Sequence, residues 1–144
     1  MQRKRVGAAA TAAATALLLT SCAGAVSDEY VIQNDPGSVK HVAGSDLGRV
    51  TLTEAAADRL GIRTTEVTRS HGRLAVPVES VFVDPEGSWW VYTSPRPRTY
   101  IRQAVDIVRE TDGKAVLSKG PAPGTEVVTV GVAEVYGVEF EVGH

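Results

Sequence analysis

The chain has 144 residues, is 43% hydrophobic, and carries 15 Lys+Arg against 17 Asp+Glu, for a net charge of −2 at pH 7. This balance argues against nucleic acid as a partner and against a polybasic membrane patch. Cys22 is the single cysteine, so no disulfide can form within the chain and a hydrophobic core has to provide the stability.

A targeting signal is expected at the N-terminal end. Three cationic residues at 3–5 precede an uncharged, alanine-rich stretch over residues 6–19, as in the n-region and h-region of a secretory signal. The stretch is short for a membrane-spanning helix, which needs about 20 residues. It leads into Leu19-Thr20-Ser21-Cys22, which resembles the lipobox that lipoprotein signal peptidase reads. We therefore expect residues 1–21 to be a lipoprotein signal peptide, and lipid on Cys22 to anchor the mature protein at the extracytoplasmic face of the cell membrane.

Processing would remove three of the 15 basic residues and none of the acidic ones, leaving 123 residues with a net charge of −5. That length suits one domain. The composition changes near residue 48, because residues 23–47 are rich in Gly, Ser and Asp, with a turn signal at 35–38 and a short apolar run at 30–32. We predict a lipidated, flexible tether over residues 22–48, with one edge strand near 29–33, and a β domain over residues 49–144.

One short helix is expected near the start of the β domain, over residues 51–61. A threonine supplies the N-cap, and Thr51 with Glu54 at capping-box spacing is an alternative start. Gly61 suits the left-handed position that ends a helix. Because a helix of two turns is marginal alone, its apolar side should pack onto a sheet.

The rest of the domain alternates short β runs with turns, as an antiparallel sheet, a sandwich or a small barrel requires. The expected strands are residues 62–68, 74–83, 89–93, 100–108, 115–117, 126–130 and 138–142. Turn signals stand at 70–72, 84–87, 94–98, 112–113, 121–124 and 134–137, and Pro77 should mark an edge or a bulge. The predicted fold class is mainly β, a small antiparallel barrel or β-roll-like domain with one short α-helix.

Several segments together carry a resemblance to a known family. They are, in chain order, residues 50–53 leading through the helix into 60–64, Val76-Pro77-Val78-Glu79-Ser80-Val81, Trp90-Val91-Tyr92, residues 101–105 and residues 123–131. Over residues 49–142 their order and spacing resemble the C-terminal part of periplasmic adaptor subunits (membrane fusion proteins, HlyD-type) of RND efflux systems. The resemblance implies β-barrel and membrane-proximal β-roll modules, which dock an inner-membrane transporter and pass conformational change toward an outer component.

The chain also departs from that family. A full adaptor carries a long α-helical hairpin and a lipoyl-like domain before this region, and the 26 residues from 23 to 48 can hold neither. The hairpin is the part that meets an outer-membrane channel. The sequence therefore indicates a detached, lipid-anchored, membrane-proximal module.

Catalytic and metal-binding patterns are weak. His41, His71 and His144 have no His, Cys or carboxylate at metal-ligand spacing. Ser70 precedes His71, but the sequence has no Gly-x-Ser-x-Gly elbow, P-loop or dinucleotide fingerprint. The single methionine, Met1, would leave with the signal, so a thioether copper or silver site is not expected. We predict no catalytic residues, no metal and no cofactor.

Aromatic and basic residues are the candidates for partner binding. They are Trp89, Trp90, Arg96, Arg98, Tyr100 and Arg102. The two tryptophans should point to opposite faces of one strand, so that one is in the core and the other is exposed or at an interface. The arginines form a cationic patch in an acidic protein and could meet lipid headgroups or an acidic partner loop. Simple packing of the tryptophans and solvation of the arginines are the alternatives.

The sequence thus predicts a non-catalytic, lipid-anchored, extracytoplasmic adaptor-like module that docks a membrane permease in an efflux or export assembly. The alternative is a ligand-binding lipoprotein that holds a small molecule or glycan in a β cleft through Trp89 or Trp90 and Tyr92. A remnant of a truncated gene is a third interpretation. The cargo, the permease and the oligomeric state are left open.

Overall fold

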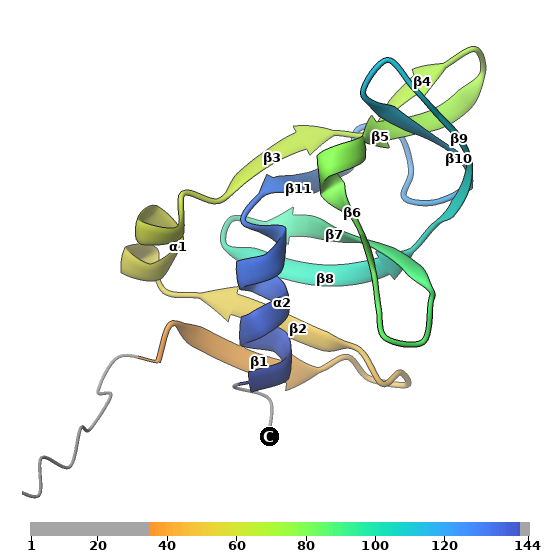
Figure 1. The fold of residues 1–144 in the computed structure, drawn as a ribbon. Coiled ribbons are helices and arrows are strands. Elements are labelled where there is room, and N and C mark those ends of the chain that lie inside the picture. The colour runs from red at the N-terminus through yellow and green to blue at the C-terminus, as the bar shows by residue number, and fades with distance from the viewer. Residues whose placement is uncertain (1–34, 142–144) are drawn as a thin grey trace, which may run out of the picture. The chain divides into compact units, whose positions relative to one another are not determined.

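The computed structural model describes residues 35–141 (Figure 1). Cys22 and the strand expected near 29–33 lie outside the described residues. The strands are β1 (Gly37–His41), β2 (Gly48–Leu52), β3 (Arg63–Glu66), β4 (Thr68–Ser70), β5 (Arg73–Pro77), β6 (Val81–Val83), β7 (Trp89–Arg96), β8 (Thr99–Ala104), β9 (Asp106–Thr111), β10 (Lys114–Lys119) and β11 (Glu126–Val130). The helices are α1 (Glu54–Leu60), the 3₁₀ turn η1 (Val78–Ser80) and α2 (Val132–Glu141).

Two antiparallel sheets make up the described region, which confirms the mainly β fold class. The seven-stranded sheet has the order β1-β2-β8-β7-β11-β3, and β6 also pairs with β7. The four-stranded sheet has the order β4-β5-β10-β9. The larger sheet ends in β1 on one side and β3 on the other, so it is an open sheet and not a closed barrel.

The short helix α1 forms as expected. The Thr53 side chain caps it by accepting a hydrogen bond from the Ala56 N–H at 3.2 Å. Gly61 ends it in the left-handed conformation, with φ 62°, and its N–H donates to the last turn. Ala56 is buried, and Ala57 and Leu60 pack against the core.

The segment at the C-terminal end corrects the sequence analysis, because residues 132–141 form the helix α2 and not a turn followed by a closing strand. Figure 1 shows α2 lying across one face of the seven-stranded sheet. Val132, Val135 and Val138 recur every third residue and pack into the core beneath, a helical spacing that the alternation at 138–142 obscured. The helix follows Gly131, whose φ is 89° and where a Cβ would overlap Ile62.

The expected tether is also corrected, because the folded part of the chain begins before residue 49. β1 pairs with β2 over five positions, from Gly37 opposite Leu52 to His41 opposite Gly48. Val39 packs against the core. The low hydrophobicity that suggested a tether reflects an edge strand, which needs only one apolar side.

Two expected strands are each divided. The run at 100–108 becomes β8 in the larger sheet and β9 in the smaller one, with Val105 buried at the crossing. The run at 74–83 is broken by η1 after Pro77 into β5 and β6. By contrast, the hairpin turn at Asp112 and Gly113 is confirmed, with φ values of 49° and 71° that suit a type I′ turn.

The core has two parts. One lies between α2 and the larger sheet and includes Val50, Leu52, Tyr92, Tyr100, Val128, Val135 and Val138. The other lies between the two sheets and their connections, and includes Val67, Val76, Val91, Val105, Ala115, Leu117 and Val127. No helix within residues 35–141 has the length and apolar character needed to cross a bilayer.

Candidate interaction surface

A buried polar network fixes α2 on the larger sheet. Glu139 of α2 is 6% exposed and accepts hydrogen bonds from the Tyr92 hydroxyl at 2.6 Å and the Gly48 N–H at 3.2 Å. The Arg102 Nε lies 3.2 Å from Glu139 Oε1. That contact is an ion pair but not an aligned hydrogen bond. Burial, and then the hydrogen bond to Glu139, raise the pKa of Tyr92, so its hydroxyl remains a donor.

The Arg102 guanidinium is enclosed by aromatic rings. Its central carbon lies 4.6 Å from the Trp90 ring centroid and 5.0 Å from that of Phe140, distances suited to cation–π attraction. The Trp90 indole N–H donates to Asp84 Oδ2 at 2.7 Å. The Arg102 side chain is 13% exposed, and it therefore serves mainly to hold β8 and α2 together.

Asp84 is the acceptor at the turn between β6 and β7. Its other carboxylate oxygen accepts from the Ser88 N–H at 2.8 Å. Loss of hydration alone would raise the pKa of Asp84, but the hydrogen bonds from Ser88 and Trp90 bring it below the ordinary value of 3.8. The charged form of Asp84 thus stabilises this turn.

A wide groove of about 730 Å³ lies beside this network. It is lined by Ser45, Asp46, Leu47, Asp84, Glu86, Trp90, Arg102 and Phe140. Three carboxylates, one enclosed guanidinium and two aromatic rings therefore share one hollow, which joins the β1–β2 turn to the β6–β7 turn.

The arginine cluster expected from the sequence is divided between two faces of the sheet. Arg102 points toward α2, and Tyr100 is 3% exposed in the core on that same face. Arg96 and Arg98 are exposed in the hairpin between β7 and β8. Arg98 adopts φ 59° and lies 3.8 Å from Glu54, an exposed pair of little energetic weight. The three arginines therefore do not form one patch.

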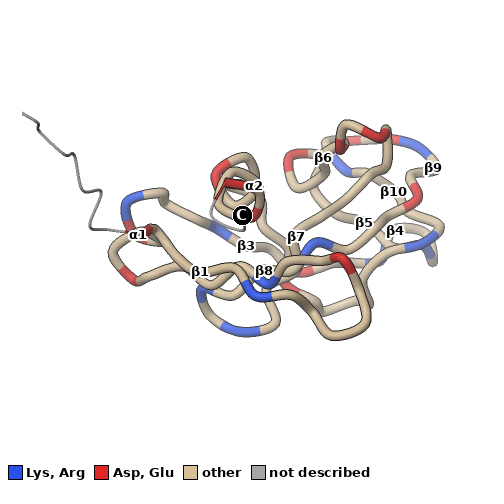
Figure 2. The backbone as a smooth tube through the Cα atoms, turned by 90° about the horizontal axis from the view of Figure 1, so that it is seen from below, with Lys and Arg blue, Asp and Glu red and all other residues tan. Residues whose placement is uncertain are grey.

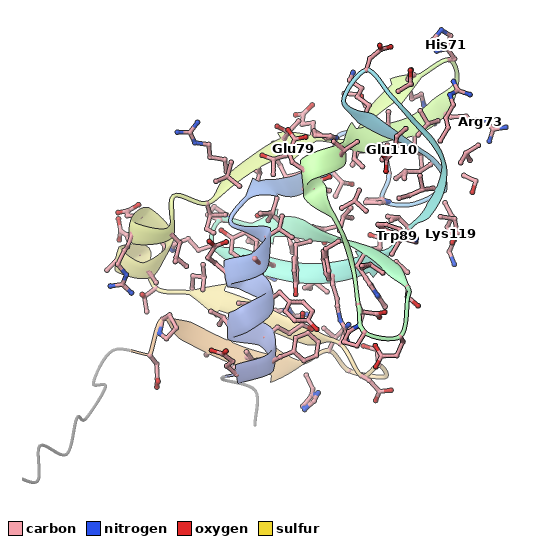
Figure 3. All side chains as sticks on the ribbon, in the orientation of Figure 1. His71, Arg73, Glu79, Trp89, Glu110 and Lys119 are labelled. Atoms are coloured by element: carbon pink, nitrogen blue, oxygen red, sulfur yellow. The ribbon has the colours of Figure 1, made fainter. Side chains whose placement is uncertain are left out.

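The two tryptophans lie on opposite faces, as expected. Trp90 faces the α2 side, whereas Trp89 is 44% exposed and opposite Val83, which is 52% exposed. Figure 3 shows Trp89 on the side of β7 that faces β9 and β10, and a hollow of about 360 Å³ there is lined by Trp89 and by residues 104–107. Tyr92 is fully buried. Trp89, Trp90 and Tyr92 consequently do not line one cleft.

The face of the larger sheet turned away from α2 carries a second group of side chains, which we call the basic face. The strand registers place Lys40 opposite Arg49, Arg49 opposite Ile101, and Arg96 opposite Thr99. The remaining members of this face are Ser38, Thr51, Thr93 and Gln103. These positions include three cations and no carboxylate. In Figure 2, α2 with its acidic positions lies on one side of β1 and β8, and segments that carry basic positions lie on the other side.

The basic face is hollowed where β2 and β8 meet the β7–β8 hairpin. The hollow has a volume of about 310 Å³ and is lined by Arg49, Thr51, Pro95, Arg96, Thr99 and Ile101. Its lining therefore contains two guanidinium groups and two hydroxyls. The sequence analysis missed Arg49 and Lys40, because only the pairing of distant strands places Arg49 in one hollow with Arg96 and Lys40 opposite Arg49.

The Ser70–His71 pair lies at the outer end of the β4–β5 hairpin, far from Trp89 (Figure 3). The Ser70 hydroxyl is 3.2 Å from His71 Nδ1, and both groups are exposed. Among residues 35–141, Ser70 and His71 make no side-chain hydrogen bond or ion pair to a carboxylate. The same residues contain no group of three or more His, Cys, Asp and Glu positioned to hold a metal ion.

The described geometry thus offers two exposed surfaces for interaction, one around Trp89 and one on the basic face, together with the groove beside Trp90. No protein-family model, no curated protein and no solved structure shows a significant match to the chain.

Proposed function

We propose that the chain is a lipid-anchored, extracytoplasmic, adaptor-like module that docks a membrane transporter in an efflux or export assembly and has no catalytic role. The exposed Trp89 carries this proposal. A tryptophan with 44% exposure, beside the exposed Val83 and a hollow, is the kind of side chain that anchors protein interfaces. The lipobox-like segment and the order of adaptor-like segments add support from the sequence.

The partner is expected to be a permease because lipid on Cys22 would hold the domain beside proteins of the same membrane. The Trp89 surface would receive an apolar side chain of an extracytoplasmic segment of that permease. Such contacts at the centre of an interface can each contribute about 2 kcal/mol or more.

The test is the variant Trp89→Ala in the full-length protein, crosslinked in its native membranes and purified with its partners. Wild-type protein should retain a polytopic permease, and the variant should retain roughly 30-fold less, which corresponds to about 2 kcal/mol. Val130→Ala is the matched control, because Val130 is 46% exposed on β11. Both variants should melt close to the wild type, since exposed substitutions usually change stability by about 0.5 kcal/mol.

Equal recovery of the permease by Trp89→Ala would remove this surface from the proposal. Failure of the wild-type protein to retain any transporter would contradict the docking function itself.

A second candidate function is ligand binding, which is favoured by the groove of about 730 Å³ beside Trp90. Its volume lies within the usual range of roughly 300–1,000 Å³ for small-molecule sites. Three carboxylates around the rings of Trp90 and Phe140 suit a small cationic molecule more than a glycan. A titration with aromatic amines, followed by tryptophan fluorescence and repeated with Trp90→Phe, separates this candidate from docking.

A further inference from the structure

The hollow of the basic face has the chemistry of an anion site. Arg49 and Arg96 come from β2 and from the end of β7, and Thr51 and Thr99 are directly opposite each other in the register. Guanidinium groups bind phosphate oxygens through paired N–H donors, and threonine hydroxyls can add further hydrogen bonds. Ile101 and Pro95 supply a small apolar part of the lining.

The cations of this face are not neutralised within the described chain. Among residues 35–141, the ion pairs are Arg98 with Glu54 and Arg102 with Glu139, so Arg49, Arg96 and Lys40 have no carboxylate within ion-pair distance. All three are exposed. The domain is acidic as a whole, yet it keeps three unpaired cations on one side of a sheet. Charge complementarity therefore favours an anionic occupant.

The position of the expected lipid anchor indicates which anion lies near the basic face. The 14 residues from 23 to 36 connect Cys22 to β1, and they span at most about 50 Å when fully extended. β1 itself contributes Ser38 and Lys40 to the basic face. This step rests on the proposed lipid anchoring, which would keep the face within reach of the membrane surface.

We propose that the basic face binds the phosphate headgroups of anionic phospholipids, with one headgroup phosphate in the hollow between Arg49 and Arg96. The hydroxyls of Thr51 and Thr99 donate to the same phosphate. Lys40, adjacent to Arg49 in the register, contacts a neighbouring headgroup. The contact turns the seven-stranded sheet toward the bilayer and leaves α2 on the opposite side. Trp89 is seven positions from Arg96 along β7, which places the two residues at most about 23 Å apart along the strand.

The experiment uses the mature lipoprotein purified from membranes and reconstituted on vesicles, with Ser38→Cys as the site of a fluorescent label. Ser38 is exposed and belongs to the basic face, but it does not line the hollow. Energy transfer to an acceptor on the lipid headgroups reports how near the face comes to the bilayer. One set of vesicles contains phosphatidylcholine alone, and the other also contains phosphatidylglycerol.

We expect energy transfer to rise in the phosphatidylglycerol vesicles and to return to the phosphatidylcholine level in Arg49→Glu and at high salt. Arg73→Glu is the matched control, since Arg73 is an exposed cation at the start of β5, outside the basic face (Figure 3). It should behave like the wild type. Equal energy transfer in both kinds of vesicle would overturn the proposal.

A measurement with inorganic phosphate distinguishes a lipid headgroup from free phosphate as the ligand of the hollow. If it raises the melting temperature of the wild type but not of Arg49→Glu, while phosphatidylglycerol has no effect, the site takes free phosphate and the membrane assignment is wrong. Sedimentation with phosphatidylcholine vesicles tests the anchor separately. Protein that fails to sediment with them would contradict the lipoprotein assignment. If the protein then sediments only with vesicles that contain phosphatidylglycerol, headgroup binding by the basic face is still supported.

Discussion

Glu139 connects three parts of the chain that are distant in sequence. Its carboxylate accepts from Tyr92 on β7 and from Gly48 at the start of β2, and it pairs with Arg102 on β8. A buried carboxylate with three partners is costly to desolvate but specific in the geometry that it permits. We infer that Glu139 determines the position of α2 on the sheet, whereas the valines and Tyr136 of α2 provide apolar contact.

Removal of Glu139 should therefore be strongly destabilising. In Glu139→Ala the guanidinium of Arg102 stays largely buried without its counter-charge, and breaking a buried pair in this way costs about 3–5 kcal/mol. Urea denaturation measures the change. Glu134→Ala, an exposed position on the same helix, should stay within about 0.5 kcal/mol of the wild type. A Glu139→Ala midpoint equal to that of the wild type would show that the ion pair and its hydrogen bonds contribute nothing net.

Asp84 should make the stability depend on pH. Its pKa in the folded protein lies below the ordinary value of 3.8, so the unfolded chain binds a proton more readily than the folded one. The stabilisation is therefore fully present above 3.8 and is lost as the pH falls through the folded pKa.

Comparison of the wild type with Asp84→Asn isolates this contribution. The variant should be less stable at neutral pH, and the difference should vanish at a pH well below 3.8. Urea denaturation at the two pH values, followed by tryptophan fluorescence, measures it. A difference that is the same at both pH values would assign the effect to packing of the turn and not to charge.

At the scale of elements, β1 is an integral strand of the larger sheet. It covers β2 over five paired positions and brings Val39 onto the core. Without β1 the outer backbone groups of β2 would face water, and a chain that begins at residue 49 also lacks the Gly48 N–H that donates a hydrogen bond to Glu139.

A chain that begins at residue 35 should consequently fold cooperatively, whereas one that begins at residue 49 should be less stable by about 2–3 kcal/mol from the lost valine contact and strand pairing. The midpoint of thermal unfolding should fall by about 10 °C or more. Circular dichroism of the two forms provides the comparison. Identical melts would mean that β1 is dispensable and that residue 49 is a true domain boundary.

At the scale of the whole molecule, the two exposed surfaces belong to different ends of one sheet face. The basic face lies toward the β7–β8 hairpin and Trp89 lies at the start of β7. A module held at a membrane could thus contact headgroups and a transporter at the same time, without either contact covering the other.

The anchor itself can be tested on the intact protein. Cys22→Ala should abolish lipid labelling, and the protein should either leave the membrane fraction or remain unprocessed, because Cys22 is the only thiol available for acylation. Membrane fractionation with a radiolabelled fatty acid provides the measurement. Wild-type protein that takes up no label, or a variant that fractionates and migrates as the wild type does, would contradict lipid attachment at Cys22.

The sequence alone determined the features that depend on neighbouring residues. A threonine cap before the first helix, the left-handed Gly61, the hairpin at Asp112 and Gly113 and the strand at 126–130 all formed as expected, because caps, turns and alternation act over a few residues. The opposite directions of Trp89 and Trp90 followed in the same way from the period of a strand.

Only the tertiary structure decided the features that depend on distant segments. The valine-rich stretch with Gly137 became the helix α2 because its valines could pack on the sheet, although its intrinsic helix propensity is low. Alternation shows which residues of a strand share a face, but not which face a helix will cover. Arg102 is enclosed beneath α2, whereas Arg49 shares the open hollow with Arg96. The pairing of β8 with β2 on one side and with β7 on the other sets which charges meet.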